Sequence, residues 1–178
     1  MSIKELAIGA VVTVVIGGSA YTINQADVVS NFAADTGMSQ QQAEEYVQGV
    51  DEKDLVPFDQ LGADYIKEGE DTLKVAAETD CVNYEYEWES VSLSCYQGKT
   101  QIEELGKDTV ALGNAYKKLG SATATKEDMS ATINVLDEVN SDYGFEIMDK
   151  ILTQADITEV RNNNSYNKSL LKAALASE

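Results

Sequence analysis

The chain has 178 residues and a net charge of −18, and it contains no histidine, two cysteines and one proline. Such an acidic chain is repelled by the phosphates of nucleic acids and of anionic lipids, so neither is expected as a partner. Without histidine, the Ser-His-Asp and Cys-His types of catalysis are excluded, and two thiols without a CxxC spacing do not make a zinc site. The length is that of one domain with one hydrophobic core.

The N-terminal segment is the most apolar part of the chain. Residues 6–23 carry no charge, and as a helix they would span about 27 Å, close to the thickness of a bilayer core. Lys4 precedes them and the next basic residue is Lys53, so the positive-inside rule places the N-terminus in the cytoplasm. We therefore predict a single-pass anchor that contacts the lipid bilayer through residues 3–23, with a periplasmic, lumenal or extracellular body.

Two further features of this segment favour different interpretations, one a retained membrane anchor and the other a cleaved signal peptide. Gly9, Thr13 and Gly17 recur every four residues, which is the spacing of a close helix–helix contact in lipid. Residues 6–16, however, also have the length of a secretory h-region, and the small residues ending at Ala20 fit a signal-peptidase site. A chain secreted after cleavage near Ala20 is therefore the rival interpretation.

The rest of the chain predicts helices nearly throughout, because helix-favouring residues are common and proline is almost absent. Ser39 and Gln42 form a capping box for a short helix. Pro57 suits the start of a long amphipathic helix that extends to about residue 79, and a second long helix follows over residues 90–119.

Small residues repeat every seven positions in both long helices. They are Gly62, Gly69 and Ala76 in the first, and Gly106, Gly113 and Gly120 in the second. Heptad spacing keeps them on one side of each helix, so the two backbones can approach closely. We predict a long antiparallel helical hairpin built on these strips.

The C-terminal third continues the helical pattern. Thr125 and Asp128 give a capping signal for the next helix, which residues 140–144 end. The polar run over residues 161–164 is expected to be a loop before a final helix. The fold class is therefore all-α: an irregular helical bundle preceded by an apolar N-terminal helix. Residues 1–23 form the anchor or signal segment, and residues 24–178 an acidic, all-helical, extracytoplasmic domain.

Cys81 and Cys95 are fourteen positions apart, and an even cysteine count in an exported chain predicts a disulfide. Two reduced, buried thiols are the alternative. Aromatic and acidic residues alternate between the two cysteines, as Tyr84, Glu85, Tyr86, Glu87, Trp88 and Glu89. An extended backbone would separate the rings from the carboxylates, giving an interaction loop for a basic peptide, an ammonium group or a divalent cation. Alternatively, the rings cap the core and the glutamates are solvated.

The sequence contains neither an EF-hand loop nor a glycine-rich nucleotide loop. We therefore predict no enzyme activity, cofactor or resident metal, although weak binding of divalent cations is compatible with the acidity. The leading hypothesis is an accessory or scaffolding subunit that binds other membrane or envelope proteins, or itself, on the non-cytoplasmic face. One alternative is a secreted or periplasmic module that binds a cationic ligand through the Tyr84 to Glu89 loop. The other is a filament or oligomer subunit that assembles through its N-terminal helix.

Overall fold

Helices dominate the computed structural model, which describes residues 11–50, 56–81, 85–88, 91–141 and 153–177. The elements follow in the order β1 (Val11–Ile16), β2 (Ser19–Asn24), α1 (Gln25–Thr36), α2 (Gln40–Gly49), α3 (Phe58–Glu78), β3 (Glu85–Trp88), β4 (Val91–Ser94), α4 (Cys95–Gly120), α5 (Lys126–Val139) and α7 (Gln154–Ala176). The prediction of a mostly helical chain is confirmed, but two antiparallel strand pairs, β1–β2 and β3–β4, accompany the helices.

The predicted N-terminal membrane helix is wrong, because its described part is a β-hairpin. Val12, Val14 and Ile16 face inward, and the intervening residues of β1 are exposed, which is the alternation of a strand with one buried face. Gly17 and Gly18 adopt φ values of 60° and 73°, as a two-residue type I′ turn requires. The β-branched run of β1 favours a strand, and the two glycines allow it to reverse.

This hairpin overturns the predicted single-pass location. None of the helices among the described residues combines the length and the apolar character needed to cross a bilayer. The alternative of cleavage near Ala20 is also contradicted, because Ala20 lies inside β2 opposite Val15. Cleavage there would divide a hairpin whose Ile16 and Ile23 are each only 1% exposed in the core.

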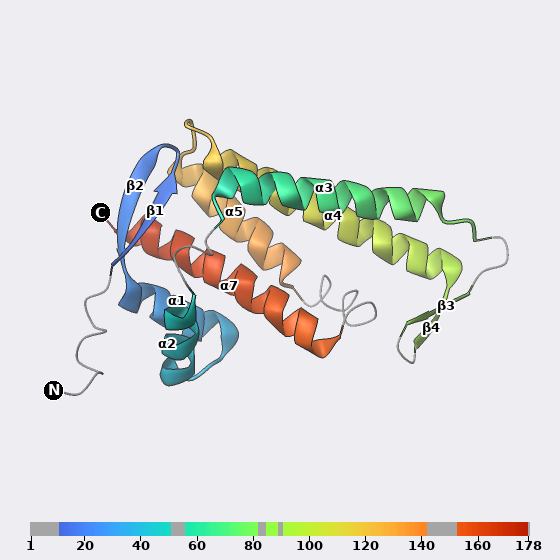
Figure 1. Cartoon of the computed structure of the whole chain (residues 1–178), viewed down its shortest axis with the longest axis horizontal. Coiled ribbons are helices and arrows are strands. Elements are labelled where there is room, and N and C mark those ends of the chain that lie inside the picture. Colours follow the sequence, from blue (N-terminus) through green and yellow to red (C-terminus); the bar gives the residue numbers. More distant parts are fainter. Residues whose placement is uncertain (1–10, 51–55, 82–84, 89–90, 142–152, 178) are drawn as a thin grey trace.

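The hydrophobic core lies between the hairpin and the helices α1, α2, α4, α5 and α7. α7 runs through the middle of this group, against α1, α5 and β2 (Figure 1). Its buried apolar residues, which include Leu170 and Leu171, meet the inward face of the hairpin and the buried side of α1. The N-terminal segment thus contributes to the core and does not stand outside the bundle.

The polar run over residues 161–164 is helical, so the predicted loop is wrong. The run lies in the interior of α7, where Asn164 is 1% exposed and donates from Nδ2 to Asn140 Oδ1 at 2.9 Å. This hydrogen bond to the end of α5 satisfies the NH2 group of the buried amide, whereas its Oδ1 has no hydrogen-bond partner among the described residues. The polarity of these residues wrongly predicted a loop, because the hydrogen-bond partner of Asn164, Asn140, lies 24 positions away in the sequence.

Capping boxes begin several of the helices. The predicted Ser39–Gln42 box of α2 is confirmed, and Thr125 and Asp128 form the same arrangement at the start of α5. α3 begins directly after Pro57. α4 begins at Cys95, later than expected, because residues 91–94 form a strand.

α3 and α4 lie side by side along most of their length and extend beyond the rest of the molecule (Figure 1). Glycines lie where the two helices are closest. A β-carbon on Gly62 would lie 2.4 Å from the Lys117 nitrogen, and one on Gly113 would lie 2.7 Å from the Ile66 nitrogen. Only a residue without a side chain fits at such contacts, which explains glycine in the interior of a helix.

Replacing Gly62 with alanine should lower the free energy of unfolding by at least about 2 kcal/mol, because the new methyl group meets backbone atoms that cannot move aside. Gly49→Ala is the matched control, since Gly49 is also helical and nothing lies within 4 Å of the place that its new methyl group would occupy. The control should be neutral or slightly stabilising. Urea denaturation of both variants makes the comparison, and equal stabilities would contradict the close contact.

Candidate functional site

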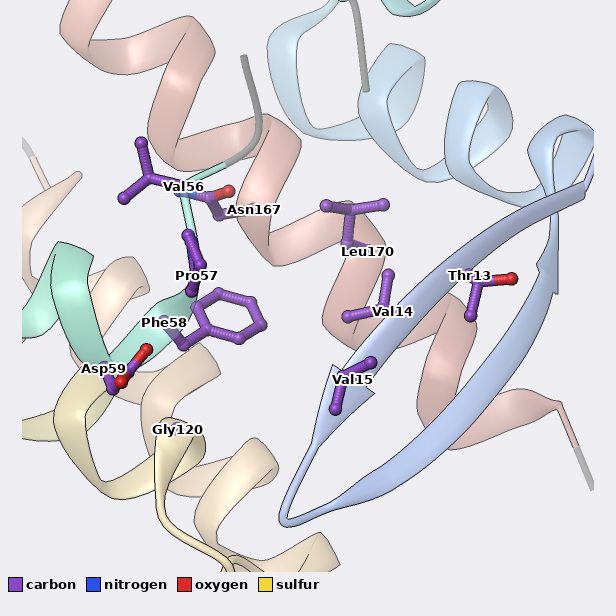
Figure 2. Close-up of a pocket in the computed structure, with 10 residues that line it drawn as sticks. All are labelled: Thr13, Val14, Val15, Val56, Pro57, Phe58, Asp59, Gly120, Asn167 and Leu170. Carbon is purple, nitrogen blue, oxygen red and sulfur yellow. The ribbon is translucent and has the colours of Figure 1, made fainter. Parts of the chain in front are cut away.

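A hollow with a volume of about 480 Å³ lies beside β1. We call it the β1 groove. Three segments far apart in the sequence line it, together with Gly120 at the end of α4: residues 13–15 of β1, residues 56–59 at the start of α3, and Asn167 and Leu170 of α7. Figure 2 shows β1 on one side, the start of α3 on the other, and α7 behind them.

On its β1 side, the groove is bounded by a strand edge that pairs with no other described strand. The two-residue turn makes Ile16 and Ser19 the closing hydrogen-bonded pair, and such pairs alternate along an antiparallel ladder. The backbone groups of Thr13 and Val15 therefore point away from β2. Among the described residues, no hydrogen-bond partner of these two backbone amides is found.

The interior of the groove is apolar and rests on packed aromatic rings. Val14 and Leu170 are buried, and Phe58 is half-buried. Phe58 stacks on Tyr116 with ring centroids 5.6 Å apart, and Tyr116 itself is fully buried. This support makes the groove a preformed feature of the surface.

Asn167 connects the groove to this buried layer. Its Nδ2 donates to the Tyr116 hydroxyl oxygen at 3.0 Å. Burial raises the pKa of the Tyr116 phenol, the nearby Tyr65 raises it further, and the hydrogen bond from Asn167 lowers it by less. The phenol therefore stays neutral at physiological pH.

The rim of the groove exposes apolar side chains to solvent. Val15 is 61% exposed and Val56 is 43% exposed, although both are large hydrophobic residues. Asp59 adds a carboxylate on the α3 side. An apolar channel with an open strand edge and few polar groups is suited to binding an extended chain.

The anchor-contact residues predicted from the sequence do not form a helix face. Gly9 lies outside the described residues. Thr13 is in β1, and Gly17 is in the turn, where its amide donates to the Leu119 carbonyl at 3.1 Å. A β-carbon on Gly17 would lie 2.5 Å from the Ala124 carbonyl oxygen, so this glycine allows the turn to dock on the α4–α5 connection.

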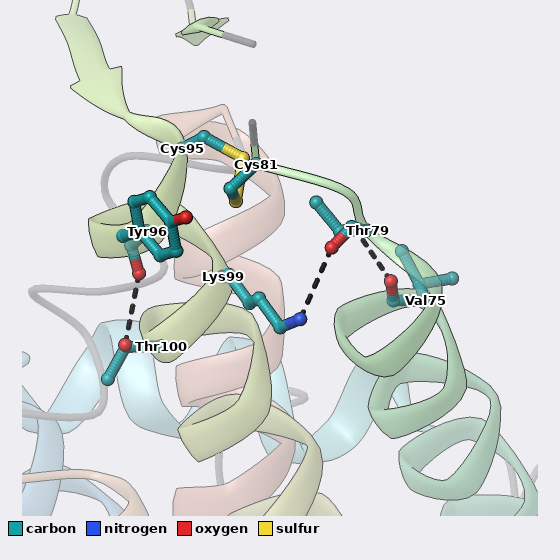
Figure 3. Close-up of a disulfide and its surroundings, with 7 residues drawn as sticks. All are labelled: Val75, Thr79, Cys81, Cys95, Tyr96, Lys99 and Thr100. Atoms are coloured by element: carbon teal, nitrogen blue, oxygen red, sulfur yellow. Dashed lines mark hydrogen bonds between the residues drawn. A yellow bond between two sulfur atoms is a disulfide. The ribbon is translucent and has the colours of Figure 1, made fainter. Parts of the chain in front are cut away.

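The two cysteines form a disulfide, with their Cα atoms 5.3 Å apart, at the distal end of α3 and α4 (Figure 3). Lys99 strengthens this end, because its Nζ donates to the Thr79 carbonyl at 3.2 Å, while the Thr79 hydroxyl donates to the Val75 carbonyl. The bridge and the lysine together join the end of α3 to the first turn of α4.

The predicted interaction loop lies beyond this disulfide. Its central part, Glu85–Trp88, is the strand β3, which pairs with β4, so the backbone there is extended as the alternation requires. Tyr84 and Glu89 lie outside the described residues. Binding of a basic peptide or a cation by this loop stays a prediction.

A second, mostly polar hollow of about 440 Å³ lies between α1, α5 and α7. Lys168, whose side chain is only 9% exposed, reaches into it and pairs with both Asp35 and Asp137. Burial lowers the pKa of Lys168, but the hydrogen bonds with Asp137 and Asp35 outweigh it and hold the pKa above its usual value. These charges pair with one another across three helices, and removing one of them would leave the largely buried Lys168 ammonium or its partner uncompensated.

Within the part of the chain that the structure describes, no three His, Cys, Asp or Glu side chains come together as metal ligands would. Comparison with known proteins finds no family model that matches the chain, and no curated protein or solved structure that is similar to it. A function must therefore be inferred from the residues of this chain alone.

The β1 groove could not be found in the sequence by searching for motifs, because its members come from three distant segments. One signal was present: a run of β-branched residues, Val11 to Ile16, followed by two glycines. This pattern is typical of a strand and a tight turn.

Replacing both Cys81 and Cys95 with alanine should lower the free energy of unfolding by about 3 kcal/mol, the value for a closed loop of about 15 residues. Thermal melting with and without a reductant measures the effect. The reductant should lower the melting temperature of the wild type and leave the variant unchanged. Intact mass shows whether the reductant has opened the bridge. If it has, and the wild type still melts at the same temperature with and without reductant, the disulfide does not stabilise the fold.

Tyr116 should make stability depend on alkaline pH. Its folded-state pKa is raised, so its contribution is complete below the unfolded value of about 10 and is lost as pH rises above it. Above pH 10, wild-type stability should fall more steeply than that of Tyr116→Phe, by about 1.4 kcal/mol per pH unit. Urea denaturation from pH 8 to 11 gives both slopes, and parallel slopes would exclude this role of Tyr116.

Proposed function

We propose that this chain is a non-enzymatic binding subunit that holds an extended segment of a partner protein against the free edge of β1. The observation that supports the proposal is the coincidence of an unpaired strand edge with an apolar groove. The backbone groups of Thr13 and Val15 point toward the same hollow that Val14, Phe58 and Leu170 line. A strand added there gains backbone hydrogen bonds from the edge and apolar contacts from the groove.

Within the described residues, the edge of β1 shows none of the devices that normally protect an exposed strand. Its sequence, VVTVVI, contains no charge and no proline, and Val11 and Val15 are 58% and 61% exposed. Natural proteins usually protect such an edge with charged residues, with proline or with a covering element. An uncharged edge that no described element covers is therefore better explained as a binding surface than as ordinary surface.

A partner of different charge suits this edge better than a second copy of the chain does. Each copy carries a net charge of −18, so pairing of two β1 edges would bring two strongly acidic bodies together. A small apolar molecule would also use the groove poorly, because Val15 and Val56 leave its rim open. An extended segment of a neutral or basic protein has neither disadvantage.

The test is a peptide selection followed by affinity measurements. A library of random twelve-residue peptides is selected on the full chain, and the enriched peptides are measured by fluorescence anisotropy against two proline variants. Thr13→Pro removes an amide from the β1 edge, whereas Thr22→Pro removes the amide of its cross-strand partner from the β2 edge. Circular dichroism and melting establish that both variants keep the fold.

Thr13→Pro should weaken peptide binding about tenfold or more, because the edge loses a hydrogen bond and gains a ring that obstructs pairing. Thr22→Pro should leave the affinity unchanged. Equal affinities for both variants, or no enriched peptide, would overturn the proposal. The proposal would also be overturned if light scattering showed a dimer for the wild type and a monomer for Thr13→Pro, since a second copy of the chain would then occupy the edge.

A further inference from the structure

The unpaired side-chain groups of the β1 groove include two hydrogen-bond acceptors. Asp59 is exposed, and no hydrogen bond or ion pair joins its carboxylate to another described residue. Asn167 donates through Nδ2 to Tyr116, an interaction that orients the amide. Its Oδ1 accepts no hydrogen bond from the described residues. A ligand side chain that completes these groups must therefore donate hydrogen bonds.

An aromatic residue precedes Asp59 in the chain and also lines the groove. Phe58 and Asp59 are consecutive residues at the start of α3, and both line the groove. Phe58 stacks on Tyr116, and Figure 2 shows its ring projecting from the start of α3 into the groove, toward Val14, with the Asp59 carboxylate on the other side of the ring. A cation beside such a ring gains electrostatic attraction, and the apolar stem of a lysine or arginine gains contact with apolar wall residues.

The charge of the groove also favours a basic ligand. Among the described residues that line it, one side chain is acidic and none is basic. The net charge of −18 also attracts basic segments over a longer range and raises their rate of association. Acidic segments are disfavoured by both effects.

We infer that the bound segment carries a lysine or arginine that pairs with Asp59 beside Phe58, next to an apolar residue that fills the groove between Val14 and Leu170. The inference rests on the proposed function, because it specifies the chemistry of the strand that β1 accepts. The groove thus selects extended segments in which basic and apolar residues occur together. An acidic residue in the first turn of a helix, such as Asp59 in α3, also stabilises the helix through its dipole, so the test must separate binding from stability.

The test uses a peptide whose binding is weakened by Thr13→Pro. Its basic residues are replaced by glutamine one at a time, and each form is titrated against the wild type and Asp59→Asn. The matched control is Asp64→Asn, since Asp64 is an exposed acid on the same helix that does not line the β1 groove. Melting curves of both variants record any effect on stability.

Asp59→Asn should weaken binding of the basic peptide about fivefold and reduce its salt dependence, whereas Asp64→Asn should change the affinity less than about twofold. For one glutamine-substituted peptide, Asp59→Asn should have no further effect, because the partner of the carboxylate is already gone. That coupling is not produced by a carboxylate that only stabilises α3.

Other outcomes would overturn the inference. If the effects of Asp59→Asn and of every glutamine substitution simply add, the carboxylate does not pair with a basic residue, although binding along β1 stands. If Asp59→Asn lowers the melting temperature without changing the affinity, Asp59 serves only the helix. If no peptide depends on Thr13, the proposed function fails together with the inference.

Discussion

Close contact at two glycines near the end of α4 determines the geometry of the β1 groove. A β-carbon on Gly120 would lie 2.4 Å from the Asp59 nitrogen, and one on Gly17 would lie 2.5 Å from the Ala124 carbonyl oxygen. The first contact brings the start of α3 against α4, and the second brings the β1–β2 turn against the α4–α5 connection. Larger residues at these positions would push the two sides of the groove apart.

The same use of glycine continues along α3 and α4. Gly62, Gly69, Gly106 and Gly113 all lie where a β-carbon would meet atoms of the opposite helix at 2.8 Å or less. Glycine is unfavourable in a helix interior by about 1 kcal/mol relative to alanine, so these positions are explained by the backbone contact that they permit. The distal disulfide then joins the ends of the two helices. One end of the pair contributes the groove, and the other carries the β3–β4 strands (Figure 1).

The proposed binding role brings together two properties that are otherwise unrelated. One is the uncharged, exposed edge of β1, which invites pairing with another strand. The other is a high negative charge over the whole chain, which opposes self-association. An open strand edge on a strongly acidic protein is thus directed toward segments of opposite charge, and Asp59 and Phe58 place that preference in the groove itself.

Local interactions explain what the sequence by itself determined. The helical character of the chain and the capping boxes of α2 and α5 depend on neighbours within a few residues, so their patterns could be recognised directly. The N-terminal segment could not be assigned in this way, because a short apolar run suits a membrane helix, a signal sequence and a buried strand alike.

Only the tertiary structure decided between these, since Val14, Ile16 and Ile23 pack in the core when the segment is a hairpin. It also showed that residues 161–164 are helical, with the Asn164 amide donating a hydrogen bond to Asn140 at the distant end of α5. The groove could be recognised only in the complete fold. Its three segments are separated by more than forty residues in the sequence, and only the packing of α3, α7 and the hairpin around the end of α4 brings them together.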